Sequence, residues 1–234
     1  MTDVREDVTV PPHRDTVVFL VDVDDTLLDN DRFREDVESH LAAGYGEPAR
    51  DAYWAIQERR FAELGYRDYL GAMQEWWLAE GMDPGLLAVA RYLLEYPYAD
   101  RLYAGALETL AHLRAAGPTV VLTDGDAVFQ PRKIERAGIR DAVDDDVLVY
   151  VHKEKELDDV ERRYPSERYV LVDDKARILA AVKRHWGERV TTVLPRTGQF
   201  ANDPDLLAAH PPPDVTVGAI GDVLALDLQD LVRG

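Results

Sequence analysis

The sequence predicts an α/β fold, in which a doubly wound (Rossmann-like) parallel sheet carries an inserted α-helical cap domain. Short apolar runs rich in β-branched residues alternate with helix-length segments after Pro97, and one such run stands near the start of the chain. The stretch between them has apolar residues at helical spacing and lacks a strand-like run. We therefore expect a loose tail of residues 1–15, a core of residues 16–30 and 99–234, and a helical cap of residues 31–98.

The first strand is predicted at residues 16–21, a continuous apolar run that is typical of a strand buried on both faces of a parallel sheet. The run stops at a cluster of acids, Asp22, Asp24 and Asp25, through which no buried strand would continue. In the cap that follows, Gly44, Gly65, Gly81 and Pro84 separate about four helices. The aromatic residues of those helices favour a packed interior over a binding surface.

The core resumes with a helix at residues 104–115, which ends at Gly117 and Pro118. Further strands are predicted at residues 119–122, 147–151, 169–172, 190–194 and 215–218. Further helices are predicted at residues 130–137, 154–163, 176–186 and 222–232. Strands that alternate with helices in this way indicate a parallel sheet with right-handed crossovers.

Polar side chains follow four of these strands, and parallel sheets place their functional sites outside the carboxyl ends of the strands. Neighbouring carboxylates repel one another unless a cation lies among them, and Mg²⁺ often binds through one or two carboxylates and a substrate phosphate. A lysine and a hydroxyl beside them suit an anionic phosphoryl group. The residues in question are Asp22, Asp24, Thr123, Lys153, Asp173 and Asp174.

This arrangement resembles the haloacid dehalogenase-like superfamily of phosphotransferases. Residues 22–27, Asp-Val-Asp-Asp-Thr-Leu, match its Asp-x-Asp-x-Thr signature after an apolar strand. Thr123, Lys153 and the Asp173-Asp174 pair match its second, third and fourth motifs in order. The resemblance covers the core, and the helical insert stands where one subclass of the family has its cap.

The resemblance implies a role for each matching residue. Asp22 would attack phosphorus and form an aspartyl-phosphate, and Asp24 would protonate the leaving alkoxide and then activate water. Thr123 and Lys153 would hold phosphoryl oxygens. Mg²⁺ would bind Asp22, the backbone carbonyl of Asp24 and an acid of the fourth motif. We prefer Asp173 for that acid, with Asp174 close behind and the other of the two orienting a ligand or Lys153.

Two departures from the family pattern concern the phosphate site. The second motif often reads Thr-Asn-Gly, whereas Asp124 follows Thr123 here, so that an acid stands among the predicted phosphate-site residues. Asp124 either points away or binds a cationic part of the substrate. The third motif often has Pro after its Lys, whereas Glu154 follows Lys153, which leaves Lys155 and, more distantly, Lys133 as rivals. The adjacent His152 is expected to be structural.

The predicted function is that of a Mg²⁺-dependent phosphatase that hydrolyses a small phosphorylated metabolite. Family members that dehalogenate generally lack an acid at the position of Asp24. A phosphomutase or phosphotransferase on the same core, a non-catalytic phosphate-binding protein and a response-regulator receiver remain alternatives. Substrate specificity is expected from the cap, with Arg59, Arg60, Tyr66 and Trp76 as candidates.

Composition excludes several other classes of function. The chain has 27 Lys and Arg against 45 Asp and Glu, and this net charge of −18 disfavours nucleic acid as a partner. The chain has no cysteine, which excludes disulfides and thiolate chemistry. No apolar run approaches the roughly 20 residues of a membrane span, and the first 15 residues lack the apolar region of a signal peptide. We expect a cytoplasmic protein that does not bind membranes.

Overall fold

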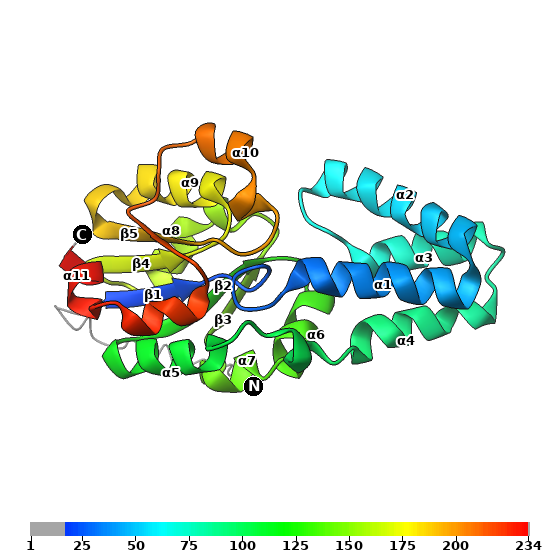
Figure 1. Cartoon of the computed structure of the whole chain (residues 1–234), viewed down its shortest axis with the longest axis horizontal. Helices are drawn as coiled ribbons and strands as arrows, with labels where there is room; N and C mark the ends of the chain where they lie inside the picture. The colour runs from blue at the N-terminus through cyan, green and yellow to red at the C-terminus, as the bar shows by residue number, and fades with distance from the viewer. Residues whose placement is uncertain (1–16, 234) are drawn as a thin grey trace, which may run out of the picture.

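The computed structural model describes residues 17–233, so the predicted tail, residues 1–15, lies outside the described residues. One part of the protein is a sheet with helices on both faces, and the other is a bundle of helices that extends from one end of the sheet (Figure 1). This arrangement confirms the predicted fold class of a Rossmann-like sheet with a helical insertion.

The sheet has six strands in the order β3-β2-β1-β4-β5-β6, and every neighbouring pair is parallel. This order is the one expected of a doubly wound sheet, with a switch point beside β1. Each predicted strand is present within two residues of its expected limits. The strands are β1 (Val17–Val21), β2 (Thr119–Asp124), β3 (Val147–Tyr150), β4 (Arg168–Val172), β5 (Val190–Pro195) and β6 (Val215–Val217).

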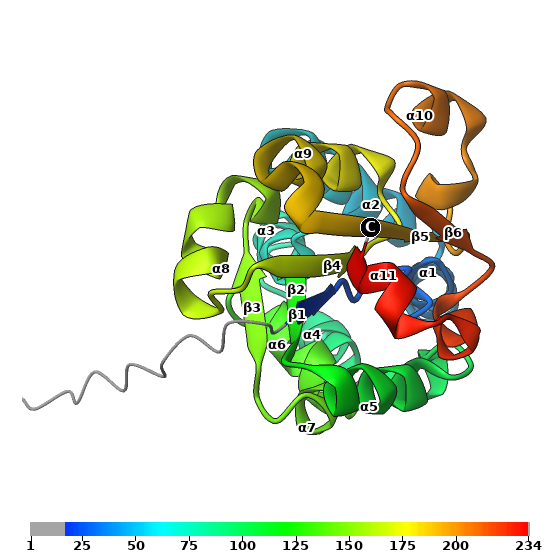
Figure 2. The same cartoon turned by 90° about the vertical axis from the view of Figure 1, so that its left-hand side faces the viewer.

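Side chains of β1 alternate between two hydrophobic clusters, one on each face of the sheet. Phe19 and Val21 pack with α5, α6, α7 and α11, whereas Val18 and Leu20 pack with α8 and α9. The two groups of helices lie on opposite sides of the sheet in Figure 2. These helices are α5 (Ala106–Ala116), α6 (Phe129–Arg136), α7 (Ile139–Ala142), α8 (Leu157–Arg163), α9 (Ala176–Trp186) and α11 (Leu228–Arg233), and the short α10 (Pro204–Ala208) lies beyond β5.

Two of the predicted helices are wrong in their extent. Residues 222–232 form a 3-10 helix, Ile220–Ala225, and then the separate α11. The break follows from Leu226, which is extended, and from Asp227, whose carboxylate accepts the N–H of Gln229 at 2.8 Å and so starts a new helix. Residues 154–163 divide similarly into a 3-10 turn, Lys153–Lys155, and α8. Asp124 Oδ1 accepts the Lys153 N–H at 2.7 Å at the start of this turn, and the Lys153 side chain is buried.

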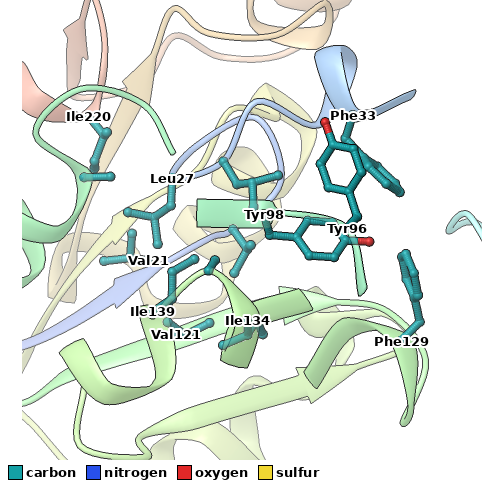
Figure 3. Packing of buried hydrophobic residues seen from close by; sticks show 14 of the residues in the cluster. Val21, Leu27, Phe33, Tyr96, Tyr98, Val121, Phe129, Ile134, Ile139 and Ile220 are labelled. Carbon is teal, nitrogen blue, oxygen red and sulfur yellow. The ribbon is translucent and has the colours of Figure 1, made fainter. Parts of the chain in front are cut away.

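The insertion contains α1 (Asn30–Tyr45), α2 (Glu47–Leu64), α3 (Tyr69–Ala79) and α4 (Leu87–Glu95). Aromatic rings join these helices to the core. Phe33 of α1 lies 4.9 Å from Tyr96 and 6.1 Å from Phe129 of α6, measured between ring centroids, and these rings are drawn in Figure 3. Because they belong to one continuous cluster with the sheet residues, the insertion packs as part of the same hydrophobic core.

The two chain segments that join the insertion to the sheet run side by side. Leu28 and Leu102 form an antiparallel bridge. Asp29 N–H donates to the Arg101 carbonyl at 2.8 Å, and Tyr103 N–H donates to the Leu27 carbonyl at 2.9 Å. The insertion therefore begins and ends at one place. Among residues 17–233, no helix is long and apolar enough to cross a membrane.

Candidate active site

The end of β1 places Asp22 at the centre of the sheet's carboxyl edge. Asp22 N–H donates to the Val172 carbonyl of β4 at 2.9 Å, which keeps the ends of the two central strands level. The chain then turns tightly, because the N–H groups of Leu27 and Leu28 both donate to the Val23 carbonyl at 2.9 Å. Asp25 lies in this turn with a positive φ of 59°. The Asp22 side chain, at the start of this turn, is buried.

Lys153 is the lysine that reaches the strand ends. Its buried Nζ lies 2.6 Å from Asp22 Oδ1 and 2.6 Å from Asp173 Oδ2, and it also donates to the Leu122 carbonyl at 3.0 Å. Lys155, the rival in the sequence, is exposed. The preceding residue, His152, lies against Gly65 at the end of α2, where the left-handed φ of 80° and the close ring exclude a side chain at position 65. His152 therefore has a structural contact.

Asp22, Asp173 and Asp174 form a buried group whose carboxylate oxygens approach within 4.8 Å of one another. Asp173 is engaged by Lys153 and by the N–H of Lys175, which donates to its Oδ1 at 2.8 Å. In contrast, Asp22 Oδ2 and both carboxylate oxygens of Asp174 accept no hydrogen bond from any described residue. Buried carboxylate oxygens without donors are the ligands that a hard divalent cation takes, so this group fits Mg²⁺.

The electrostatics of this group of carboxylates also favour a bound cation. Burial favours the neutral form of Asp22, but the Lys153 and Lys175 ammonium groups outweigh it and lower the pKa of this carboxyl, which keeps Asp22 ionised. Burial raises the pKa of Asp174 well above its usual value despite Lys175, and it raises the pKa of Asp173 despite Lys153. The lysines alone therefore leave this group short of positive charge, which a bound cation would supply.

Asp24 lies across from this group and is held by two residues of α6. Lys133 Nζ lies 2.6 Å from Asp24 Oδ1 and 3.2 Å from Asn30 Oδ1, and its side chain is buried. Gln130 Nε2 donates to Thr123 Oγ1 at 3.0 Å and to Asp24 Oδ2 at 3.4 Å. Sequence reasoning identifies Lys133 only as a distant rival of Lys153 and misses Gln130. Their spacing of three residues on a predicted helix is the one signal that the sequence offers.

Thr123 and Asp124 end β2 next to Lys153. Thr123 is buried, and its hydroxyl faces Gln130 as described above. Asp124 Oδ1 accepts the backbone N–H of Lys153 at 2.7 Å. This bond gives the Asp124 carboxylate a part in holding the loop that carries Lys153. Its inclusion among the phosphate-site residues stays a prediction.

A cavity of about 120 Å³ separates the insertion from the sheet edge, with Asp24, Asp124 and Lys175 on its core side. Residues of the insertion that line it are Asn30, Asp31, Arg34, Phe61, Gly65, Tyr66, Arg67 and Tyr69. Of the four specificity candidates, only Tyr66 lies in this lining. Arg59 pairs with Glu75, Arg60 pairs with Asp68, and Trp76 is buried among the cap helices.

The chain is similar to known proteins in both sequence and structure. The model of the haloacid dehalogenase-like hydrolase family matches residues 16–193. A structure described as a haloacid dehalogenase-like hydrolase from Burkholderia xenovorans LB400 is 51% identical, with a TM-score of 0.87 over 92% of this chain and 98% of that chain. The L-2-haloacid dehalogenase from Xanthobacter autotrophicus is 19% identical, with a TM-score of 0.60 over 93% of this chain and 98% of that one.

A haloacid dehalogenase-like family hydrolase from Xanthomonas campestris is 20% identical, with a TM-score of 0.63 over 94% of this chain and 95% of that chain. These last two likenesses show the fold alone. No curated protein matches the chain. The family match spans the strands β1 to β4, most of β5, the insertion and the carboxylates at the strand ends, and it agrees with the motif order in the sequence. The chain belongs to the haloacid dehalogenase-like hydrolase family.

Proposed function

We propose that the protein is a Mg²⁺-dependent phosphatase that hydrolyses a small phosphomonoester through an aspartyl-phosphate on Asp22. One observation carries the proposal. Asp22 Oδ1 is held by Lys153, while Asp22 Oδ2 and the Asp174 carboxylate lie close by without a hydrogen-bond donor from the described residues. A fixed, ionised carboxylate with one free oxygen is a competent nucleophile.

The reaction has two displacements at phosphorus. In the first, Asp22 Oδ2 forms a bond to phosphorus, the bond to the leaving oxygen breaks, and Asp24 gives that oxygen its proton. In the second, Asp24 takes a proton from water, the water oxygen attacks phosphorus, and the bond to Asp22 breaks to release inorganic phosphate. Thr123 and Lys153 hold phosphoryl oxygens and offset their developing charge.

The metal would be held by Asp22, the backbone carbonyl of Asp24 and Asp174. We assign Asp174 in preference to Asp173, because Asp173 is already engaged by Lys153 and the Lys175 N–H. Asp173 instead orients Lys153. When bound, Mg²⁺ offsets the repulsion between the carboxylate nucleophile and the phosphate.

Asp24 supports phosphoester chemistry over dehalogenation. A halide leaves without a proton, so a dehalogenase has no use for an acid at this place. Here the Asp24 carboxylate lines the cavity and is fixed by Lys133 and Gln130. A phosphomutase or phosphotransferase would use the same residues, and it would differ only in the acceptor of the phosphoryl group.

The test is phosphate release from an aryl phosphate, with and without Mg²⁺, by the wild type, Asp22→Asn and Asp158→Asn. Asp158 is 89% exposed and controls for the same chemical change. We expect Mg²⁺-dependent turnover in the wild type and Asp158→Asn, and none in Asp22→Asn. In Asp24→Asn, a phosphodonor should leave Asp22 phosphorylated, as detected by intact-protein mass spectrometry. Turnover by Asp22→Asn, or halide release from a 2-haloacid in place of phosphate release, would overturn the proposal.

A further inference from the structure

Two residues of the cap face the cavity with donors that have no acceptor. Arg34 of α1 and Tyr69 of α3 both line the cavity. Arg34 Nε and the Tyr69 hydroxyl are buried, and neither has a hydrogen-bond partner among the described residues. Buried polar groups are nearly always paired, so two such donors on one wall of a cavity indicate a missing acceptor.

Arg34 also differs from the neighbouring arginines of the cap in its charge partner. Arg67, which lines the same cavity, pairs with Glu58 at 3.0 Å. The carboxylate paired with Arg34 is Glu38 on the solvent side, and Glu38 Oε1 lies 3.8 Å from Arg34 Nε, beyond hydrogen-bond distance. Arg34 therefore brings a guanidinium with unused donors to the cavity.

Among the described residues, the core side of the cavity offers a second anion no cation that lacks a carboxylate partner. Asp25, Asp124 and Asp126 line this side together with Lys133, Lys175 and Arg177. Lys133 Nζ lies 2.6 Å from Asp24, Arg177 lies 3.2 Å from Glu154, and Lys175 lies 3.8 Å from Asp174. A ligand whose phosphoryl group lies at Asp22 would therefore place a second anion at the cap.

We infer that Arg34 and Tyr69 form a subsite for a carboxylate on the substrate, and that the enzyme acts on phosphomonoesters of short hydroxy acids. The inference rests on the proposed phosphatase function. A guanidinium binds a carboxylate through two parallel N–H donors, and a neutral phenol adds a third hydrogen bond. The cavity of about 120 Å³ is comparable to the ~150 Å³ cavity that accepts benzene, so the acid has few carbon atoms.

The experiment compares two substrates, phosphoglycolate and the derivative in which a neutral amide replaces its carboxylate. The wild type should prefer the carboxylate. Arg34→Gln should lower kcat/KM for the carboxylate about ten- to hundredfold, the range for a charged hydrogen bond, and should lower kcat/KM for the amide much less. Tyr69→Phe should give a smaller loss of the same kind, and Arg34→Lys should restore part of the preference. Arg59→Gln is the matched control, because Arg59 pairs with Glu75 and does not line the cavity.

A binding measurement tests the carboxylate subsite independently of the phosphatase proposal. Calorimetric titration of Asp22→Asn protein with each compound, in Mg²⁺, reports the subsite without turnover. Tighter binding of the carboxylate that Arg34→Gln abolishes supports the subsite even if no phosphate is released. Equal affinity for the carboxylate and the amide would overturn the subsite, and so would an equal loss of affinity for the two compounds in Arg34→Gln. Neither outcome would change the result of the aryl phosphate assay, which tests the phosphatase proposal.

Discussion

Lys133 donates a hydrogen bond from its buried ammonium group to the Asp24 carboxylate across 2.6 Å, from a helix more than a hundred residues further along the chain. The same ammonium group contacts Asn30 at the start of α1. Lys133 thus fixes the proposed acid at the point where the insertion leaves the sheet. The Lys133 ammonium group also lies 5.9 Å from the ring centroid of Phe33 and 5.6 Å from that of Phe129, within the range of a cation–π interaction.

Lys133→Met should lower kcat about ten- to hundredfold, a part of the roughly 10²–10⁴-fold that a positioned acid or base contributes. The loss should be larger for an alkyl phosphate than for a nitrophenyl phosphate, because a poor leaving group depends more on protonation by Asp24. Steady-state kinetics with both substrates check this prediction. Arg132→Met is the control, because Arg132 is an exposed neighbour paired with Glu135, and it should leave kcat for both substrates unchanged. Equal losses for the two substrates would indicate a purely structural role for Lys133.

Lys153→Met should destabilise the protein by about 3–5 kcal/mol, the cost of leaving a buried charge without its partner. Asp22 and Asp173 both lose their ammonium partner in this variant. Urea unfolding at neutral pH measures the change in the free energy of unfolding. Lys155→Met removes the same charge from an exposed side chain and should stay within about 0.5 kcal/mol of the wild type. A similar cost in both variants would contradict the assignment of Lys153.

Lys175→Met should bind Mg²⁺ more tightly than the wild type, by roughly tenfold or more. Lys175 Nζ lies 3.8 Å from Asp174 Oδ1, so its positive charge opposes a cation among the carboxylates. The Mg²⁺ dissociation constant from isothermal titration checks the prediction. Lys183→Met, at a lysine paired with Asp214, serves as the control. Unchanged or weaker Mg²⁺ binding by Lys175→Met would show that Lys175 helps to hold the metal site together.

Acid should weaken the link between the insertion and the sheet through Asp36. Burial alone would raise the pKa of this carboxyl, but hydrogen bonds from Tyr96 and Arg101 outweigh it and lower the pKa. A lowered folded pKa means that the stabilisation is complete above the unfolded value of about 3.9 and is lost as pH falls through the folded value. Asp36→Asn should therefore melt at a lower temperature than the wild type at pH 7, and the difference should vanish as the pH falls through the lowered pKa of Asp36.

Thermal melts across this pH range give the comparison for Asp36→Asn. Asp51→Asn is a suitable control, since Asp51 pairs with Arg50 on an exposed surface of α2. That variant should follow the wild type at every pH. A difference between Asp36→Asn and the wild type that persists undiminished at low pH would show that the carboxylate charge is not its cause.

The sequence is sufficient for the sheet and for the residues that end its strands. A buried parallel strand is a local pattern of β-branched and apolar residues, and the carboxyl ends of such strands must share one edge. Asp22, Thr123, Lys153 and the Asp173-Asp174 pair can therefore be assigned to one edge of the sheet from local patterns alone. The structure places them there and separates Lys153 from Lys155 by burial.

Other residues cannot be found this way, because their roles depend on packing between distant segments. Lys133 and Gln130 face Asp24 only because α6 lies against the turn after β1. Arg34 and Tyr69 face the cavity only because the helical insertion folds over the sheet edge. The break at Leu226 and Asp227 is a different case: it is local, yet a single capping bond outweighs the helical spacing of the residues around it.

The bridge between Leu28 and Leu102 has a consequence for how this enzyme can change over evolutionary time. The chain leaves the sheet and returns to it at neighbouring points, so a longer, shorter or unrelated segment could replace the insertion without altering the strand order. The proposed nucleophile and metal ligands are encoded outside that segment, whereas Arg34 and Tyr69 are encoded within it. New substrates can therefore be acquired by recombination or drift in one stretch of the gene while the hydrolytic chemistry is inherited intact.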